Sequence, residues 1–214
     1  MPGFLLYSLR EVTELDRKPN AASEQTRHAL AQALKTLMAQ KPLEKITIHD
    51  ITELCGIRRQ NFYYHFEDVY DLMHWMFEEE AVSLLREHEG TELWQEGMLQ
   101  LYRYIEANRA VCLCALRSLG RNSLKRFFER DIYAIIHRTV EQIGTEVGAL
   151  GHGGSDEDAE MMTHYYVVAA AGMMESWLVG EIQKTPEEII AFMDRVISDH
   201  MHGAAARLKE QHEE

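Results

Sequence analysis

Apolar residues recur at every third or fourth position through most of the 214-residue chain, a period typical of helices that bury one side. Leu30, Leu34 and Leu37 lie on one such stripe, and similar stripes continue toward the C-terminus. Strand-like alternation is confined to the short stretch KITI. Only four prolines occur, and Pro186 suits the first position of a helix capped by Thr185. We therefore predict an all-α fold.

The composition indicates a soluble cytoplasmic protein. Hydrophobic residues make up 46% of the chain and charged residues 27%, as in globular domains. Three cysteines, without a secretion signal, indicate reduced thiols rather than a disulfide framework. The first twelve residues lack the basic region and cleavage site of a signal peptide. The longest apolar run, residues 162–179, contains His164 and Glu175, so we expect a buried helix and no membrane partner.

The helical pattern divides the chain into three parts. Residues 1–22 show no period and are predicted to form an N-terminal tail. Residues 23–80 are predicted to form a small head of short helices. Residues 81–214 are predicted to form a second domain of longer helices, at about 91–107, 109–119, 122–147, 156–182 and 186–209.

The head contains a helix-turn-helix pattern. Thr47 and Asp50 form a capping box that begins a short helix, and Gly56 ends it. A second short helix follows at residues 59–66, with Phe62 and Phe66 predicted to face inward. Two short helices joined by a glycine-containing turn are typical of proteins that place the second helix in the major groove of DNA.

The outward side chains of this motif suit contacts with DNA. Arginine pairs with guanine, glutamine and asparagine pair with adenine, and hydroxyl or imidazole groups contact phosphates. The candidate DNA-binding residues are Thr47, His49, Arg58, Arg59, Gln60, Asn61, Tyr63, Tyr64 and His65. Residues 25–66 contain six basic and three acidic residues, a net charge of +3 inside a chain of −13. Such a local charge favours phosphate binding, although an ordinary solvated helix face would look similar.

The stretch TIHDITELCGIRRQNFYYHFEDVYDLMHWMF resembles the DNA-binding segment of the TetR/AcrR family of bacterial transcriptional regulators. The residues that carry the resemblance are Thr47, Gly56, Ile57, the run 62–66, Asp71 and Leu72. The variant RRQNFYYHFEDVYDL is also similar to a subgroup that contains activators of dihydroxyacetone kinase genes. Two positions depart from the family pattern. Arg58 replaces the usual Ser or Thr, and Val69, preceded by Glu67 and Asp68, replaces the usual phosphate-binding Lys.

The resemblance implies a homodimer that reads a pseudo-palindromic operator in double-stranded DNA. It also implies that residues 81–214 bind an unknown small-molecule or protein effector; repression and activation both stay open. Two other classes of protein compete with this interpretation. An enzyme is disfavoured because the sequence contains no glycine-rich phosphate loop, nucleophile elbow or metal-ligand cluster, so neither a catalytic residue nor a cofactor is predicted. The alternative is a helical protein-interaction adaptor, or an activator that depends on a co-activator, with weak or no DNA reading of its own.

The sequence predicts two further sets of functional residues in the second domain. Small residues spaced by four and an apolar stripe suggest a dimer interface made of Gly172, Ser176, Gly180, Ile189, Met193, Val196 and Ile197. The small residues could equally serve packing within one subunit. By the resemblance, helices within 91–147 surround a ligand pocket, for which the candidates are Tyr102, Arg117, Arg121, Phe127 and Tyr133. Core packing and solvated surface are the competing explanations for these residues.

Overall fold

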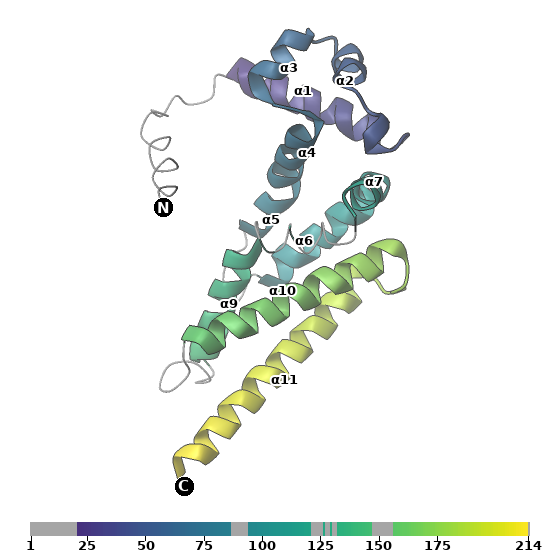
Figure 1. The fold of residues 1–214 in the computed structure, drawn as a ribbon. Coiled ribbons are helices and arrows are strands. Elements are labelled where there is room, and N and C mark those ends of the chain that lie inside the picture. The colour runs from purple at the N-terminus through teal and green to yellow at the C-terminus, as the bar shows by residue number, and fades with distance from the viewer. Residues whose placement is uncertain are drawn as a thin grey trace, which may run out of the picture.

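The computed structural model describes residues 21–86, 94–120, 126, 129, 132–146 and 156–213. Every regular element within these ranges is helical, which confirms the predicted all-α fold (Figure 1). In this described part of the chain, no helix is both long and apolar enough to cross a membrane.

The head contains four α-helices and one 3₁₀ turn: α1 (Ala21–Met38), η1 (Leu43–Lys45), α2 (Ile48–Cys55), α3 (Arg59–His65) and α4 (Val69–Phe77). Ser23 lies within the first turn of α1. The side chains that face inward from these helices are fully buried at Leu30, Leu34, Ile51, Phe62 and Leu72. Burying such apolar side chains holds α2 and α3 in a fixed position on α1 and α4.

The body continues from the head without a break in the helix. After α4 the chain forms one π-helical turn, η2 (Glu78–Val82), and then α5 (Ser83–Arg86). The other described helices are α6 (Trp94–Ala107), α7 (Arg109–Leu119), α9 (Tyr133–Glu146), α10 (Asp156–Val179) and α11 (Pro186–Glu213). Helix α10 packs mainly on α9, and α11 packs on α6. The C-terminal half of α11 extends beyond the other helices (Figure 1).

Head and body are joined by packing and by a polar link. Val111, Cys114 and Ala115 of α7 belong to the core of the head. Within the π turn, Glu80 forms an ion pair with Lys35 of α1 and accepts a hydrogen bond of 2.9 Å from the hydroxyl of Tyr104 on α6. The predicted boundary between residues 80 and 81 therefore lies inside a turn that contacts both parts. We name Lys35, Glu80 and Tyr104 the junction triad.

Tyr102 offers a test of core packing. Its side chain is 0% exposed, and its ring lies edge-on to Trp177 with centroids 5.0 Å apart. The hydroxyl finds no hydrogen-bond partner within the described residues, and burial raises the pKa of Tyr102, which keeps the group neutral. Because an unpaired buried hydroxyl is unfavourable, we expect Tyr102→Phe to raise the free energy of unfolding by about 1 kcal/mol in urea titrations.

The neighbouring Tyr104 is the matched control. Tyr104→Phe removes the same atom but also a hydrogen bond to the carboxylate of Glu80, so it is expected to lower the free energy of unfolding by about 2 kcal/mol. A loss of stability of equal size in both variants would show that the Tyr102 hydroxyl does have a partner.

Candidate nucleic-acid interface

The turn between α2 and α3 is built as the sequence predicted. The Asp50 amide donates to the Thr47 hydroxyl at 3.2 Å, and the Thr47 amide donates to the Asp50 carboxylate at 2.8 Å, which completes the capping box. Gly56 ends α2 with φ = 67°, a left-handed conformation that side chains with a Cβ rarely adopt. The Ile57 amide then donates to the Thr52 carbonyl at 2.9 Å, so the direction of α3 is fixed by the turn.

Helix α3 has one buried side and one exposed side. Phe62 is 0% exposed and Phe66 is buried beside it, with ring centroids 6.0 Å apart. The other side chains of α3 and of its N-cap are exposed at Arg58, Arg59, Gln60, Asn61, Tyr63 and Tyr64. Tyr64 is 83% exposed, an unusual environment for a large aromatic ring. This surface, residues 58–61, 63 and 64, is called the α3 face.

Arg59 is held along the α3 face by its neighbour one turn later. Its Nη2 donates a hydrogen bond of 2.9 Å to the Tyr63 hydroxyl, and its guanidinium lies 5.6 Å from the centre of that ring. Both groups are exposed, and such a contact at an exposed site stabilises by only about 0.5–1 kcal/mol. A bidentate pair with a base is worth about 1–3 kcal/mol and would outweigh it.

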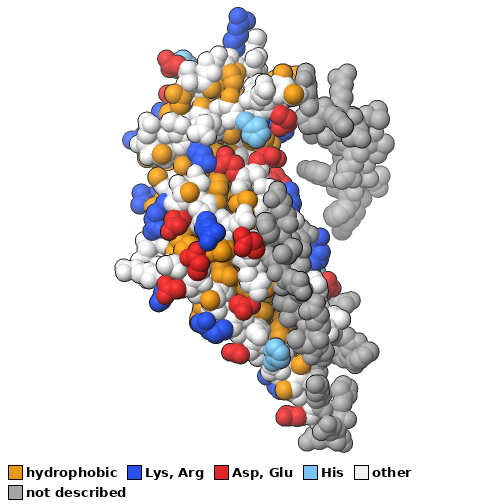
Figure 2. Space-filling model, turned by 180° about the vertical axis from the view of Figure 1, so that it is seen from behind, with side chains coloured by type: hydrophobic (Ala, Val, Ile, Leu, Met, Phe, Trp, Pro, Cys, Tyr) orange, Lys and Arg blue, Asp and Glu red, His pale blue; other side chains and the backbone are white. Residues whose placement is uncertain are grey.

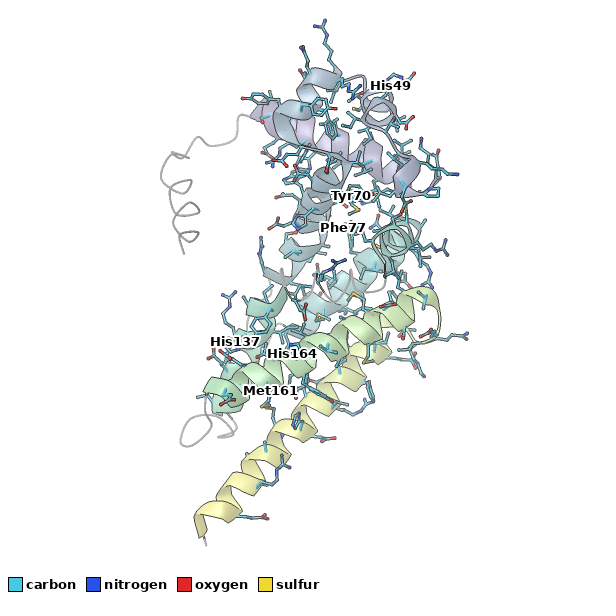
Figure 3. The ribbon with its side chains drawn as sticks, viewed as in Figure 1. His49, Tyr70, Phe77, His137, Met161 and His164 are labelled. Atoms are coloured by element: carbon cyan, nitrogen blue, oxygen red, sulfur yellow. The ribbon has the colours of Figure 1, made fainter. Side chains whose placement is uncertain are left out.

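The three predicted residues outside the α3 face differ in their availability. The Thr47 hydroxyl donates to the Asp50 carboxylate at 2.8 Å, so it is already engaged within the capping box. His49 is exposed on α2 at the upper end of the head, with Nε2 3.7 Å from Glu53 (Figure 3). His65 is half-buried, and burial, assisted by the charge of Arg27, lowers its pKa. At neutral pH His65 therefore can offer a neutral N–H, and not a positive charge, to a phosphate.

The positive charge of the head is concentrated near α2 and α3. Lys35 pairs with Glu80 in the junction triad. Lys41 lies 2.9 Å from Asp50. The hydrogen bond from the Thr47 amide, and next the contact with Lys41, hold the pKa of Asp50 well below its usual range. Exposed basic side chains remain at Lys45, Arg58 and Arg59. On the body, basic and acidic side chains are intermixed over the face shown in Figure 2.

A second departure from the family pattern has a structural reason. Val69 is buried and packs in the core of the head, where a lysine could not be accommodated without losing that contact. Asp68 caps α4 by accepting from the Asp71 amide at 2.8 Å, and Asp71 accepts from the Glu67 amide at 3.0 Å. The start of α4 thus carries capping carboxylates, which do not favour a phosphate contact.

The three predicted ligand-pocket residues that the structure describes do not line one cavity. Tyr102 is buried in the core, and Tyr133 stacks on His137 with centroids 5.8 Å apart. Arg117 is exposed on α7 and borders a shallow surface depression beside η1. Arg121 and Phe127 lie outside the described residues. None of the three lines either of two apolar cavities formed by the described helices of the body, because the helices turn these side chains into the core or the solvent.

The predicted dimer residues lie in four different environments. Ile189 is 2% exposed and packs in the core of its own chain. Gly180 lies past the end of α10 with φ = 92°, and Ser176 accepts the backbone bonds that close this helix end. Gly180 therefore does not continue the spacing of small residues along α10, which the helix carries only through Gly172 and Ser176. Gly172 and Val196 are exposed, and Met193 and Ile197 are half-buried. Val196, Met193 and Ile197 line a cavity.

The structure adds an apolar stripe that the sequence did not identify. Met161, Tyr165, Val168 and Val179 of α10 are exposed, as is Phe192 of α11. On α10 these residues and Gly172 are spaced by three, four or seven positions, so they lie along one side of the helix. Figure 3 labels Met161 on this helix. We name this set the α10 stripe. Helix α10 is apolar nearly all round, so its period could not show which side stays exposed.

A helix-turn-helix head joined to a helical body is typical of one class of proteins, the helical transcriptional regulators. Residues 92–199 match a TetR family model described as the C-terminal region of transcriptional regulators. The chain belongs to the TetR family of transcriptional regulators.

The chain is similar to one curated protein, the HTH-type dhaKLM operon transcriptional activator DhaS of Lactococcus lactis subsp. lactis (strain IL1403). The two are 33% identical over 84 residues, which span 39% of this chain and 45% of that relative's length. Among solved structures, dihydroxyacetone kinase operon activator DhaS has a TM-score of 0.63 at 22% identity and covers 82% of this chain and 96% of its own. TetR family repressor AlkX from Dietzia sp. strain DQ12-45-1b scores 0.44 at 16% identity, covering 84% and 96%.

Proposed function

We propose that this chain is a homodimeric DNA-binding regulator that reads a pseudo-palindromic operator with α3 and responds to an effector bound by residues 81–214. The observation that carries the proposal is the α3 face. Arginine, glutamine, asparagine and tyrosine side chains project from a short helix whose opposite side is fixed in the core by Phe62 and Phe66. Such a helix presents donors to base edges while the rest of the head stays rigid.

A second copy is needed because one head covers only a few base pairs. In helix-turn-helix dimers the two recognition helices contact half-sites about one helical turn apart. The α10 stripe supports a partner on this side of the body, since several large apolar side chains are exposed together there. Gly172 and Val196 are kept in the proposed interface, whereas Ile189 and Gly180 are not.

Control would act through a shift between head orientations. An effector that binds the body more tightly in one orientation changes the affinity of the protein for DNA. DNA then changes the affinity for the effector by the same factor. The junction triad supports such coupling, because Glu80 connects α1 of the head to α6 of the body through its two partners. The relative described as an activator supports activation as the direction of control.

An interaction adaptor without DNA reading is the second candidate. It is favoured by the buried Val69 and by the carboxylates of Glu67 and Asp68 at the start of α4. A gel shift with the DNA upstream of the protein's own gene distinguishes the two functions. We expect specific retention whose affinity falls steeply between low and moderate salt, as phosphate contacts require. Absence of retention at any salt concentration would favour the adaptor.

Arg58 provides a prediction about phosphate contacts. As an exposed N-cap residue without a side-chain capping bond, it can supply the charge that Val69 lacks. We expect Arg58→Ala to weaken binding to all DNA sequences alike and to reduce the slope of log affinity against log salt by about 1. Arg103→Ala, which removes an exposed arginine from the body, should leave the slope unchanged. A loss restricted to one base sequence would instead assign Arg58 to base reading.

A further inference from the structure

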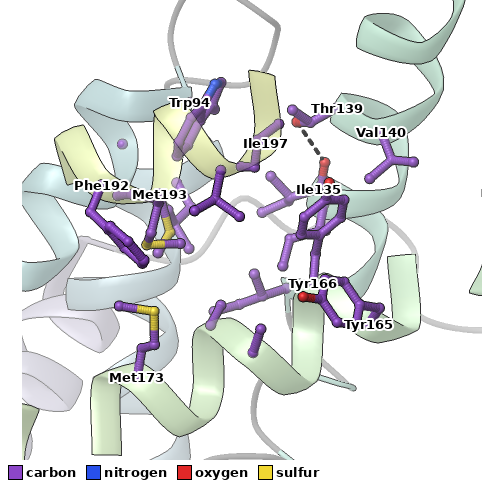
Figure 4. A pocket seen from close by; sticks show the side chains of 18 of the residues that line it. Trp94, Ile135, Thr139, Val140, Tyr165, Tyr166, Met173, Phe192, Met193 and Ile197 are labelled. Atoms are coloured by element: carbon purple, nitrogen blue, oxygen red, sulfur yellow. Dashed lines mark hydrogen bonds between the residues drawn. The ribbon is translucent and has the colours of Figure 1, made fainter. Parts of the chain in front are cut away.

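A cavity of about 120 Å³ lies in the body between α10 and α11, with further walls from α5, α6 and α9 (Figure 4). Its deep end is formed by buried side chains such as Ile132, Ala170 and Met201, and its outer rim by the exposed Tyr165 and Phe192. The cavity therefore reaches from the surface into the core. None of the predicted pocket residues described above lines it.

The walls of this cavity select against charge. All of its described lining residues are uncharged, and most are aliphatic, aromatic or methionine. Two of its polar side chains are paired within the protein. The Thr139 hydroxyl donates to the Ile135 carbonyl at 3.0 Å, and the Tyr166 hydroxyl lies 2.8 Å from Nδ1 of His200. An ion placed here would lose hydration without gaining a counter-charge, whereas an apolar molecule would lose little.

The size and softness of the cavity define its ligand further. A buried cavity of about 150 Å³ can hold benzene, so this one suits a molecule of about one aromatic ring. Met98, Met173, Met193 and Met201 contribute to the walls, and their unbranched side chains can adapt to different shapes. Helices α10 and α11 lie on opposite sides of the cavity and α6 and α9 form further walls, so a bound molecule would set the separation of these helices.

We propose that this cavity binds an uncharged, apolar small molecule about the size of a single aromatic ring, and that it is the effector site of the regulator. The effector role rests on the proposed function. Ligand binding itself does not, and it is measurable without DNA.

Trp94 makes the test direct because its side chain lines the cavity, whereas Trp75 lies in the head and Trp177 packs on Tyr102. Titration of the full chain with iodobenzene, an uncharged quencher, is expected to remove part of the tryptophan fluorescence in a saturable way. Toluene should compete for the site, whereas benzoate, of similar size but charged, should not. Equal competition by benzoate would overturn the proposal.

Two substitutions that fill the cavity complete the test. Ala169→Leu on α10 and Thr139→Leu on α9 each add bulk to a lining residue and should weaken iodobenzene binding at least tenfold. Ala134→Leu adds the same side chain to an exposed position of α9 outside the cavity and should leave binding unchanged. Circular dichroism melts identify which filling variants are folded, and unchanged quenching in a folded one would overturn the proposal.

The other possible occupant is a side chain of a second copy, because Tyr165 and Phe192 belong to both the rim and the α10 stripe. Saturable quenching that appears only in Val168→Glu, a variant designed to be monomeric, would show that the partner fills the cavity and would overturn the proposal.

The gel shift is scored separately. DNA retention without probe binding rejects the ligand site alone, whereas probe binding without DNA retention rejects the proposed regulator and leaves the site standing.

Discussion

Replacing Arg59 with alanine is expected to weaken operator binding by about 1–3 kcal/mol per half-site and to relax the preference at one base pair in each. Arg59 is exposed on the α3 face, and its present partner, the Tyr63 hydroxyl, is neutral and equally exposed. The side chain can therefore turn toward a guanine at small cost. Fluorescence anisotropy with operators that differ at single base pairs measures both effects.

The control for this experiment is Arg103→Ala, which also removes one exposed arginine but on α6 of the body. It should alter operator affinity only slightly. If Arg59→Ala lowers affinity while every base preference is retained, Arg59 contacts phosphates. If neither affinity nor preference changes, α3 does not read the operator through Arg59.

Placing a carboxylate in the α10 stripe is expected to have the second large effect. Val168 is 41% exposed and lies midway along the stripe, so Val168→Glu should leave the fold of one chain intact. In a dimer the same carboxylate would be buried without a partner, which costs several kcal/mol. We expect the variant to sediment as a monomer and to lose at least a hundredfold in operator affinity, because two half-sites are no longer bound together.

Ala134→Glu introduces the same charge on an exposed part of α9 and should remain dimeric with unchanged operator affinity. Analytical ultracentrifugation and the anisotropy assay cover both variants. A dimeric Val168→Glu protein would place the interface elsewhere, and a monomeric variant with full operator affinity would contradict the need for two heads.

Local signals allowed the head to be predicted from the sequence. The Thr47–Asp50 capping box and the left-handed Gly56 each depend on residues a few positions apart, and both are present in the structure. The inward position of Phe62 and Phe66 also follows from helical period alone. The outward direction of the α3 face is a consequence of these local features, so its exposure could be anticipated. Its contact with DNA stays a prediction.

The features of the body depend on contacts between distant segments, so the sequence could not specify them. The junction triad joins residues from three helices, and Lys35 and Glu80 are far apart in the chain. The π turn at Glu78–Val82 interrupts a pattern that period alone extends as one helix. The predicted pocket residues are charged or aromatic, whereas the described lining of the cavity in Figure 4 is uncharged and resembles the core of any helical domain, so the sequence does not mark it.

The most direct test of DNA reading by a pair of α3 helices is a hydroxyl-radical footprint on the DNA upstream of the protein's own gene. We expect two protected segments whose centres lie about one helical turn, or about 10 base pairs, apart, and both should disappear with Val168→Glu. Protection of one segment alone would contradict reading by a pair of α3 helices. So would the absence of any protection at protein concentrations high enough to saturate unrelated DNA.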